Sequence, residues 1–80
     1  MKARVYVTLK PSVFDPQGKT IHDALHTLGY AQVAGVRQGK YFELDLQADS
    51  PEAARASVEE ISRRVLANPV IESFRVELLA

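Results

Sequence analysis

Apolar and polar residues alternate strictly over the first ten residues of the chain, which predicts a β-strand over residues 2–10. Successive side chains of a strand point to opposite faces of a sheet. One face therefore carries Ala3, Val5, Val7 and Leu9, and the other carries Lys2, Arg4, Tyr6, Thr8 and Lys10. Pro11 ends this strand, because proline has no N–H to donate to a neighbouring strand.

A second alternating stretch begins near Gly39 and predicts a β-hairpin made of strands over residues 32–38 and 40–47. Gly39 is the predicted turn residue, because a tight hairpin loop needs a positive φ that glycine adopts without a Cβ clash. After the turn, Phe42, Leu44 and Leu46 share one face, while Tyr41, Glu43 and Asp45 share the other. This strand is expected to be buried on one side only.

Two stretches with helical periodicity flank the predicted hairpin, and both begin with a capping residue followed by proline. The first begins at Asp15-Pro16, with Thr20 as an alternative start, and ends at Gly29. Its apolar stripe consists of Ile21, Ala24, Leu25 and Leu28. The second begins at Ser50-Pro51, ends at Asn68-Pro69, and has an apolar stripe of Ala54, Val58, Ile61 and Val65.

A last strand over residues 70–78, burying Phe74, Val76 and Leu78, completes the order β-α-β-β-α-β. The expected fold is a single α+β domain over residues 1–80, with two helices packed on one face of a four-stranded antiparallel sheet in the ferredoxin-like arrangement. The open face of that sheet would carry Tyr6 and Tyr41 among charged residues. Because tyrosine is enriched at protein interfaces, we expect these two residues to take part in self-association as a homodimer or tetramer.

The composition of the 80 residues limits the class of protein. Ten basic and ten acidic residues give a net charge of zero, which provides no electrostatic reason to expect nucleic acid or an anionic membrane as a partner. No stretch approaches the roughly 20 apolar residues of a membrane span, and the alternating N-terminus does not resemble a signal peptide. A cytoplasmic location is therefore expected. The chain has no cysteine, so disulfides and thiolate metal sites are excluded.

No arrangement of residues in the sequence predicts catalysis or a metal site. His22 and His26 have the i, i+4 spacing of zinc ligands, but the sequence holds no third histidine, and two solvent-facing side chains are the favoured interpretation. Neither a nucleophile–base pair nor a glycine-rich phosphate loop is present. Residues 39–42 faintly resemble an RNA-binding strand. RNA binding is not expected, because Glu43 and Asp45 would repel RNA phosphates on the same face.

Polar turns at element ends are the predicted contact points for other proteins, since loops on a rigid scaffold often carry such contacts. The residues expected to bind partners are Asp15, Gln17, Arg37, Lys40 and Asn68. Arg37 is the strongest single candidate, because a guanidinium can form two hydrogen bonds with one carboxylate. Helix capping by Asp15 and helix termination at Asn68-Pro69 are the competing interpretations for those residues.

Four motifs extend this interpretation, because their order and spacing resemble the PurS family over the whole chain. They are Val5-x-Val7-x-Leu9-Lys10, Asp15-Pro16-Gln17-Gly18, Val36-Arg37-Gln38-Gly39-Lys40 and Asn68-Pro69-Val70-Ile71-Glu72. PurS is the small subunit of phosphoribosylformylglycinamidine synthase in purine biosynthesis. The resemblance implies a non-catalytic accessory subunit.

In that family the synthase makes formylglycinamidine ribonucleotide from formylglycinamide ribonucleotide, glutamine and ATP. The resemblance implies two partners, a glutaminase subunit (PurQ) and a synthetase subunit (PurL), which use the glutamine and the ATP; it implies no cofactor for the small subunit itself. Two other interpretations remain: a free-standing regulatory domain that binds a small ligand, and a degenerate enzyme related to acylphosphatases. The proteins that co-purify with the chain would distinguish the three.

Overall fold

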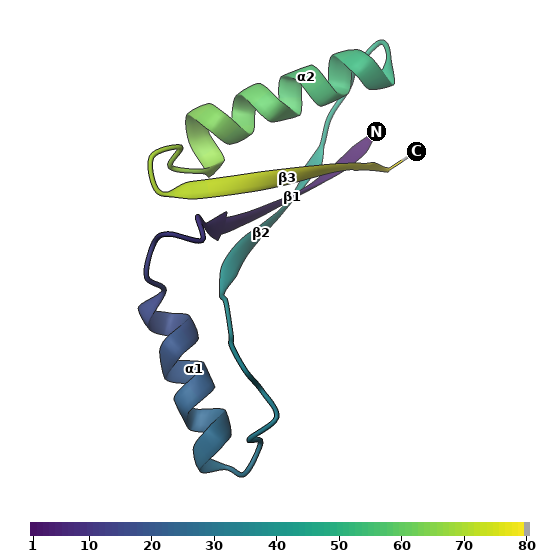
Figure 1. The fold of residues 1–80 in the computed structure, drawn as a ribbon. Coiled ribbons are helices and arrows are strands. Elements are labelled where there is room, and N and C mark those ends of the chain that lie inside the picture. Colours follow the sequence, from purple (N-terminus) through teal and green to yellow (C-terminus); the bar gives the residue numbers. More distant parts are fainter. Residues whose placement is uncertain (80) are drawn as a thin grey trace.

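The N-terminal strand, β1 (Lys2–Leu9), is the centre of a three-stranded antiparallel sheet in the computed structural model, which describes residues 1–79 (Figure 1). It pairs with β2 (Gly39–Asp45) on one edge and with β3 (Glu72–Leu79) on the other. Val5 and Val7 are completely buried, as their alternation with polar residues predicted. The predicted α+β class and antiparallel sheet are thus confirmed, with three strands among the described residues.

The second helix, α2 (Pro51–Ile61), packs over the apolar face of the sheet (Figure 1). Its predicted start is confirmed, because the Ser50 side chain accepts a hydrogen bond of 3.1 Å from the Ala53 backbone N–H, and Pro51 follows the cap. Ala54 and Val58 are buried against the sheet, as their spacing of four residues predicted. This helix and β1 supply most of the core.

The helical segment ends just before Asn68-Pro69, as predicted, but its last turn is a π-helical turn, η1 (Ser62–Leu66), which follows α2. The Ala67 backbone N–H donates across five residues to the Ser62 carbonyl, at 2.8 Å. Ser62 is the residue buried beneath Val58, and its hydroxyl donates to the Val58 carbonyl at 2.7 Å. The predicted burial of Ile61 and Val65 was wrong: both are exposed, Val65 by 76%.

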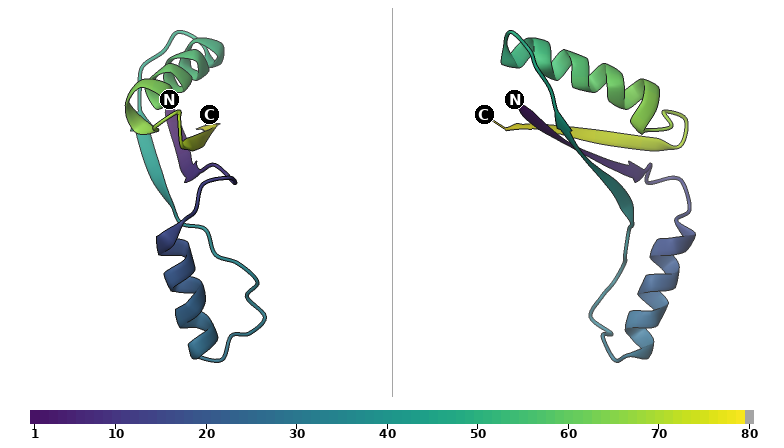
Figure 2. Two further views of the ribbon diagram at one scale, coloured as in Figure 1. Left: turned by 60° about the vertical axis from the view of Figure 1, so that its left-hand side comes forward. Right: turned by 180° about the vertical axis from the view of Figure 1, so that it is seen from behind.

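The first helix, α1 (Pro16–Thr27), projects beyond the end of the sheet and does not cover its face (Figures 1 and 2). The predicted packing of both helices on one sheet face was therefore wrong for α1. Its apolar stripe stays accessible within this chain, with Leu28 exposed by 73% and Ile21 by 40%. We call α1 together with residues 28–38 the arm.

The predicted hairpin at Gly39 was also wrong, because residues 32–38 form no strand and Gly39 is the first residue of β2. Residues 30–38 instead run back along α1: the Tyr30 backbone N–H donates to the Leu25 carbonyl, and a ring nitrogen of His26 lies 2.6 Å from the Val33 carbonyl oxygen. Gly29, with φ of 100°, reverses the chain at the tip of the arm, as predicted.

Candidate functional site

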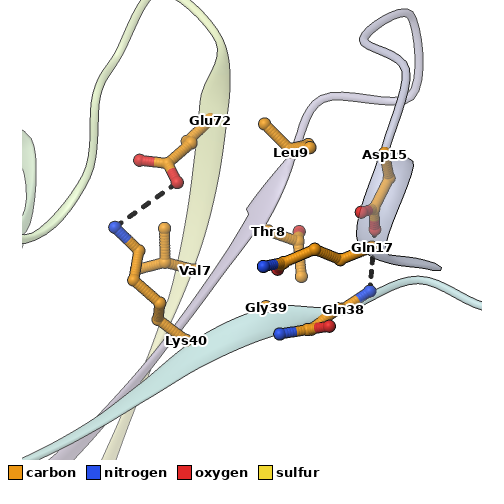
Figure 3. Close-up of a pocket in the computed structure, with 9 residues that line it drawn as sticks. All are labelled: Val7, Thr8, Leu9, Asp15, Gln17, Gln38, Gly39, Lys40 and Glu72. Carbon is orange, nitrogen blue, oxygen red and sulfur yellow. Dashed lines mark hydrogen bonds and ion pairs between the residues drawn. The ribbon is translucent and has the colours of Figure 1, made fainter. Parts of the chain in front are cut away.

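A small cavity lies at the base of the arm, where α1 and all three strands meet (Figure 3). Its volume is about 210 Å³, and it is lined by Val7, Thr8, Leu9, Asp15, Gln17, Gln38, Gly39, Lys40 and Glu72. Three of the five residues predicted to bind partners, Asp15, Gln17 and Lys40, are brought together here. Arg37 and Asn68 do not line the cavity.

Asp15 ties the two ends of the arm to each other through both oxygens of its carboxylate. Oδ1 accepts a hydrogen bond of 2.9 Å from the Gly18 backbone N–H, which confirms the predicted helix cap. Oδ2 accepts a second one of 2.8 Å from the Gln38 backbone N–H. The Gln38 N–H, and after it the Gly18 N–H, lower the pKa of the Asp15 carboxyl below its usual range, so the group is ionised at neutral pH.

Gly18 allows the close approach between α1 and the segment that returns from the tip of the arm. It is buried, and a Cβ at this position would collide with the Val36 carbonyl oxygen and lie 2.7 Å from Asp15 Oδ2. Only a residue without a side chain fits between these two groups. The geometry of the arm base therefore depends on Asp15 and Gly18 together.

An ion pair forms the opposite wall of the cavity. Lys40 Nζ lies 3.4 Å from Glu72 Oε2, and the side chain of Glu72 is only 14% exposed while that of Lys40 is 53% exposed (Figure 3). Glu72 Oε1 also accepts a hydrogen bond of 2.7 Å from the Asn68 backbone N–H. The carboxylate of Glu72 is consequently held in place from two sides.

The side-chain amides of Gln17 and Gln38 lie between Asp15 and Lys40 in the cavity (Figure 3). Within residues 1–79 neither amide group has a hydrogen-bond partner. Each can donate and accept hydrogen bonds. The cavity thus combines two exposed amide groups with two carboxylates and one ammonium group.

The other residues that the sequence predicted as contact points have different surroundings. Asn68 builds the turn after η1: its Oδ1 accepts a hydrogen bond of 3.0 Å from the Val70 N–H, which fits the competing interpretation of helix termination. Arg37 is exposed and lies beside a separate shallow groove of the arm that includes Phe14 and Val36. The partner contacts predicted for these residues stay predictions.

The two tyrosines predicted to support self-association lie side by side on the open face of the sheet. The ring centroids of Tyr6 and Tyr41 are 5.3 Å apart, and the guanidinium carbon of Arg75 lies 4.3 Å from the centroid of the Tyr6 ring. Arg4 and Glu77 form an ion pair of 3.2 Å on the same face. This face combines aromatic surface with paired charges, as interfaces often do.

The two histidines of α1 stack on each other, with ring centroids 4.2 Å apart. His22 Nδ1 lies 3.1 Å from Asp23 Oδ1, while His26 is engaged by the Val33 carbonyl. In the part of the chain that the structure describes, no group of three or more His, Cys, Asp or Glu residues could hold a metal ion. No helix in residues 1–79 is both long and apolar enough to span a membrane.

Among the charged and amide side chains that line the cavity, Gln38 and Glu72 are those that sequence reasoning missed. Both belong to the motifs that resemble PurS, and this was the only signal that could have identified them. Alternation placed Glu72 inside a strand that begins at residue 70, and Gln38 next to a hairpin turn, so neither was expected near Asp15. Their proximity results from β1 pairing with both β2 and β3.

Residues 2–80 match the family model described as PurS, phosphoribosylformylglycinamidine (FGAM) synthase. The PurS subunit of phosphoribosylformylglycinamidine synthase from Bacillus subtilis is 46% identical over 77 residues, which are 96% of this chain and 90% of that protein. The corresponding subunit from Synechocystis is 44% identical over 96% of this chain and 77% of that protein.

Solved structures of PurS proteins are also similar to this chain. PurS from B. subtilis superposes with a TM-score of 0.87 at 44% identity, covering 99% of this chain and 98% of that chain. A chain in the structure of PurLQS from Thermotoga maritima superposes with a TM-score of 0.90 at 32% identity, covering 98% of this chain and 95% of that chain.

Proposed function

The chain belongs to the PurS family, and from this premise we propose that it is an accessory subunit of phosphoribosylformylglycinamidine synthase in purine biosynthesis. The observation that carries the proposal is the match over nearly the full length of the chain, both to curated PurS subunits and to a chain of the PurLQS structure from T. maritima. In this role it assembles with a glutaminase subunit (PurQ) and a synthetase subunit (PurL).

The chain contributes binding surfaces to this assembly, and its partners supply the catalysis. Among the described residues that line the cavity, none is a cysteine, serine or histidine positioned beside a general base. We therefore assign the use of glutamine and ATP to the partner subunits and no cofactor to this chain. A cytoplasmic location accords with that role.

The shape of the arm supports a function in assembly. The helix α1 projects from the sheet with its apolar residues accessible, and another chain that covers it would bury these residues. The open sheet face with Tyr6 and Tyr41 is a second surface for association. We propose that the subunit forms a homodimer or tetramer, and that Arg37 on the arm and the residues of the cavity contact the larger subunits.

Reconstitution tests the proposed function. The chain is mixed with purified glutaminase and synthetase subunits, and formylglycinamidine ribonucleotide formed from glutamine is measured with and without it. We expect the chain to raise synthesis and to show no hydrolysis of glutamine or ATP alone. Unchanged synthesis would contradict the proposal.

The alternative of a regulatory domain that binds a small ligand is less well supported. Ligand pockets commonly measure about 300–1,000 Å³; the cavity at the arm base has about 210 Å³, and the grooves of about 450 and 460 Å³ elsewhere are open and shallow. The family membership also favours the accessory subunit.

A further inference from the structure

We propose that the open face of the sheet packs against the open face of a second copy of this chain, about a two-fold axis that crosses β1 between Arg4 and Tyr6. The inference rests on the proposed self-association and adds the orientation of the two copies and the residues in contact. No element of residues 1–79 covers this face, whereas α2 covers the opposite one (Figures 1 and 2). Tyr41 on the open face is 50% exposed, and the side chain of Arg75 is 68% exposed.

The register of the three strands arranges the outward side chains in rows that run across the sheet. Each row holds one residue from each strand, because outward residues recur at every second position. The two middle rows are Glu43–Arg4–Glu77 and Tyr41–Tyr6–Arg75, and the rows of Lys2 and Thr8 lie on either side. Acids and bases of these rows balance, with Glu43, Asp45 and Glu77 against Lys2, Arg4 and Arg75. Two such faces therefore do not repel each other through net charge.

The proposed axis runs across the strands, midway between the two middle rows. It places each middle row of one copy on the other middle row of the second copy, with every strand facing its own equivalent. The facing pairs are Arg75 with Glu77, Arg4 with Tyr6, and Tyr41 with Glu43. They join a guanidinium to a carboxylate, a cation to an aromatic ring, and a phenol donor to a carboxylate. Each favourable contact occurs twice in the pair of copies.

The other two-fold arrangement of the same faces, about an axis along β1, is unfavourable. It would place Arg4 opposite Arg4 of the second copy. Because β2 of one copy would then lie on β3 of the other, Glu43 would face Glu77. Like charges that face each other across an interface disfavour it. In the proposed arrangement the same side chains supply both halves of every contact, which selects a second copy of the chain as the occupant of this face.

Within one chain, Glu77 and Arg75 keep binding capacity for this contact. Oε1 of Glu77 accepts a hydrogen bond from Arg4 Nη1 at 3.2 Å, whereas Oε2 lies 4.0 Å from Arg75 Nη1, too far for a hydrogen bond. A guanidinium of the second copy can therefore bind Oε2. Arg75 lies over the Tyr6 ring, with its guanidinium carbon 4.3 Å from the centroid, and its N–H donors stay available at the surface.

Mixing two charge-reversed variants tests the arrangement. Arg75→Glu places carboxylates opposite each other in both symmetric contacts, and Glu77→Arg places guanidinium groups there. Each variant alone should associate about tenfold more weakly than the wild type, whereas an equimolar mixture should form mixed pairs almost as strongly as the wild type, because an acid then faces a base at both contacts. Sedimentation equilibrium measures the association constants, and thermal melts check that each variant folds.

Arg55→Glu and Glu59→Arg, in an exposed ion pair of α2, are the control and should associate like the wild type, alone and mixed. Recovery on mixing cannot arise from contacts within one chain, because the two reversed charges are in different molecules. Single variants that associate like the wild type, or a mixture that associates no better than they do, would overturn the proposal. A monomeric wild-type chain would contradict the proposed self-association itself, and this inference with it.

Crosslinking distinguishes the two orientations without changing the middle rows. The chain has no cysteine, so Thr8→Cys and Lys2→Cys each introduce a single thiol. The proposed axis places Thr8 opposite Lys2 of the second copy, across sheets packed about 10 Å apart. A bismaleimide of about that length should link the two variants in a mixture, and should not link Thr8→Cys chains to each other. Absence of linkage in the mixture, or efficient linkage of Thr8→Cys alone, would overturn the proposal.

Discussion

The carboxylate of Asp15 lies 2.8 Å from the backbone nitrogen of Gln38, a residue 23 positions further along the chain, and this hydrogen bond closes the base of the arm. The same carboxylate caps α1 through the Gly18 N–H. One side chain therefore fixes both the beginning of the helix and the point at which the chain returns to the sheet. Asp15 thus holds the two ends of the arm together.

Replacing Asp15 by alanine should lower the melting temperature by about 5 °C, because the helix loses its cap and the arm loses its link to Gln38. Asp15→Asn should lower the melting temperature less, since an amide oxygen can still accept one of the two hydrogen bonds. Thermal melts by circular dichroism measure both effects. Asp49→Ala, an exposed substitution near the other helix, serves as the control; an equal loss there would contradict the special role of Asp15.

The contribution of Asp15 should depend on pH in a defined direction. Its pKa is lower in the folded chain than in the unfolded chain, mainly because of the Gln38 N–H, so the stabilisation is complete above the unfolded pKa of about 3.9. It is lost as the pH falls from there through the lower folded value. The difference in melting temperature between wild type and Asp15→Asn should therefore be constant near neutrality and shrink below about pH 4. A difference that persists in strong acid would contradict this assignment.

Gly18→Ala should destabilise the chain although alanine is the better helix former. Helix propensity alone would favour alanine by about 1 kcal/mol, but the new Cβ would collide with the Val36 carbonyl. Overpacking of this kind costs about 2 kcal/mol, so the net loss is about 1 kcal/mol, which corresponds to a melting temperature about 5 °C lower. Gly35→Ala is the matched control, because nothing lies within 4 Å of its Cβ position. Equal melting temperatures of the two variants would mean that the backbone at the arm base shifts enough to accommodate the added Cβ.

Replacing Tyr6 and Tyr41 together by aspartate should reduce self-association. The two rings are in contact on the open face, and two added charges would disfavour its burial in an interface. Light scattering at micromolar concentration should show a shift towards the 8.9 kDa monomer. Ser73→Asp, on β3 and on the same sheet face but outside the ring pair, is the comparison. An unchanged oligomer in the double variant would place the interface elsewhere.

Arg37→Glu should weaken assembly with the larger subunits and leave the melting temperature nearly unchanged. The side chain is exposed on the arm and has no ion pair within residues 1–79, so little of the fold depends on it. Gel filtration of the variant mixed with both subunits, beside its thermal melt, measures the two properties. Normal assembly would show that this residue is not a contact, and unfolding would show that it belongs to the fold.

The local features of the chain were predictable because each depends on neighbouring residues. Asp15-Pro16 and Ser50-Pro51 begin helices through hydrogen bonds within three residues, and Gly29 ends α1 through its own backbone conformation. The alternation around Val5 and Val7 likewise identified the central strand and its buried face. The motifs that resemble PurS identified the family without any tertiary information.

The sequence by itself determined the helices, the three strands and the family, because side-chain periodicity and capping act over a few residues. Only the tertiary structure decided where these elements lie. Residues 32–38 were expected to pair with the next strand as a hairpin, but β2 pairs with β1 instead, and the Asp15–Gln38 hydrogen bond and the contact of His26 with Val33 hold the segment beside α1. Likewise, Ser62 is buried one turn after Val58, and the wider π-turn that begins at Ser62 rotates the residues after it, so that Ala67 is buried and Val65 is exposed. The cavity between Asp15 and Glu72 exists only because strands far apart in the sequence pair with β1.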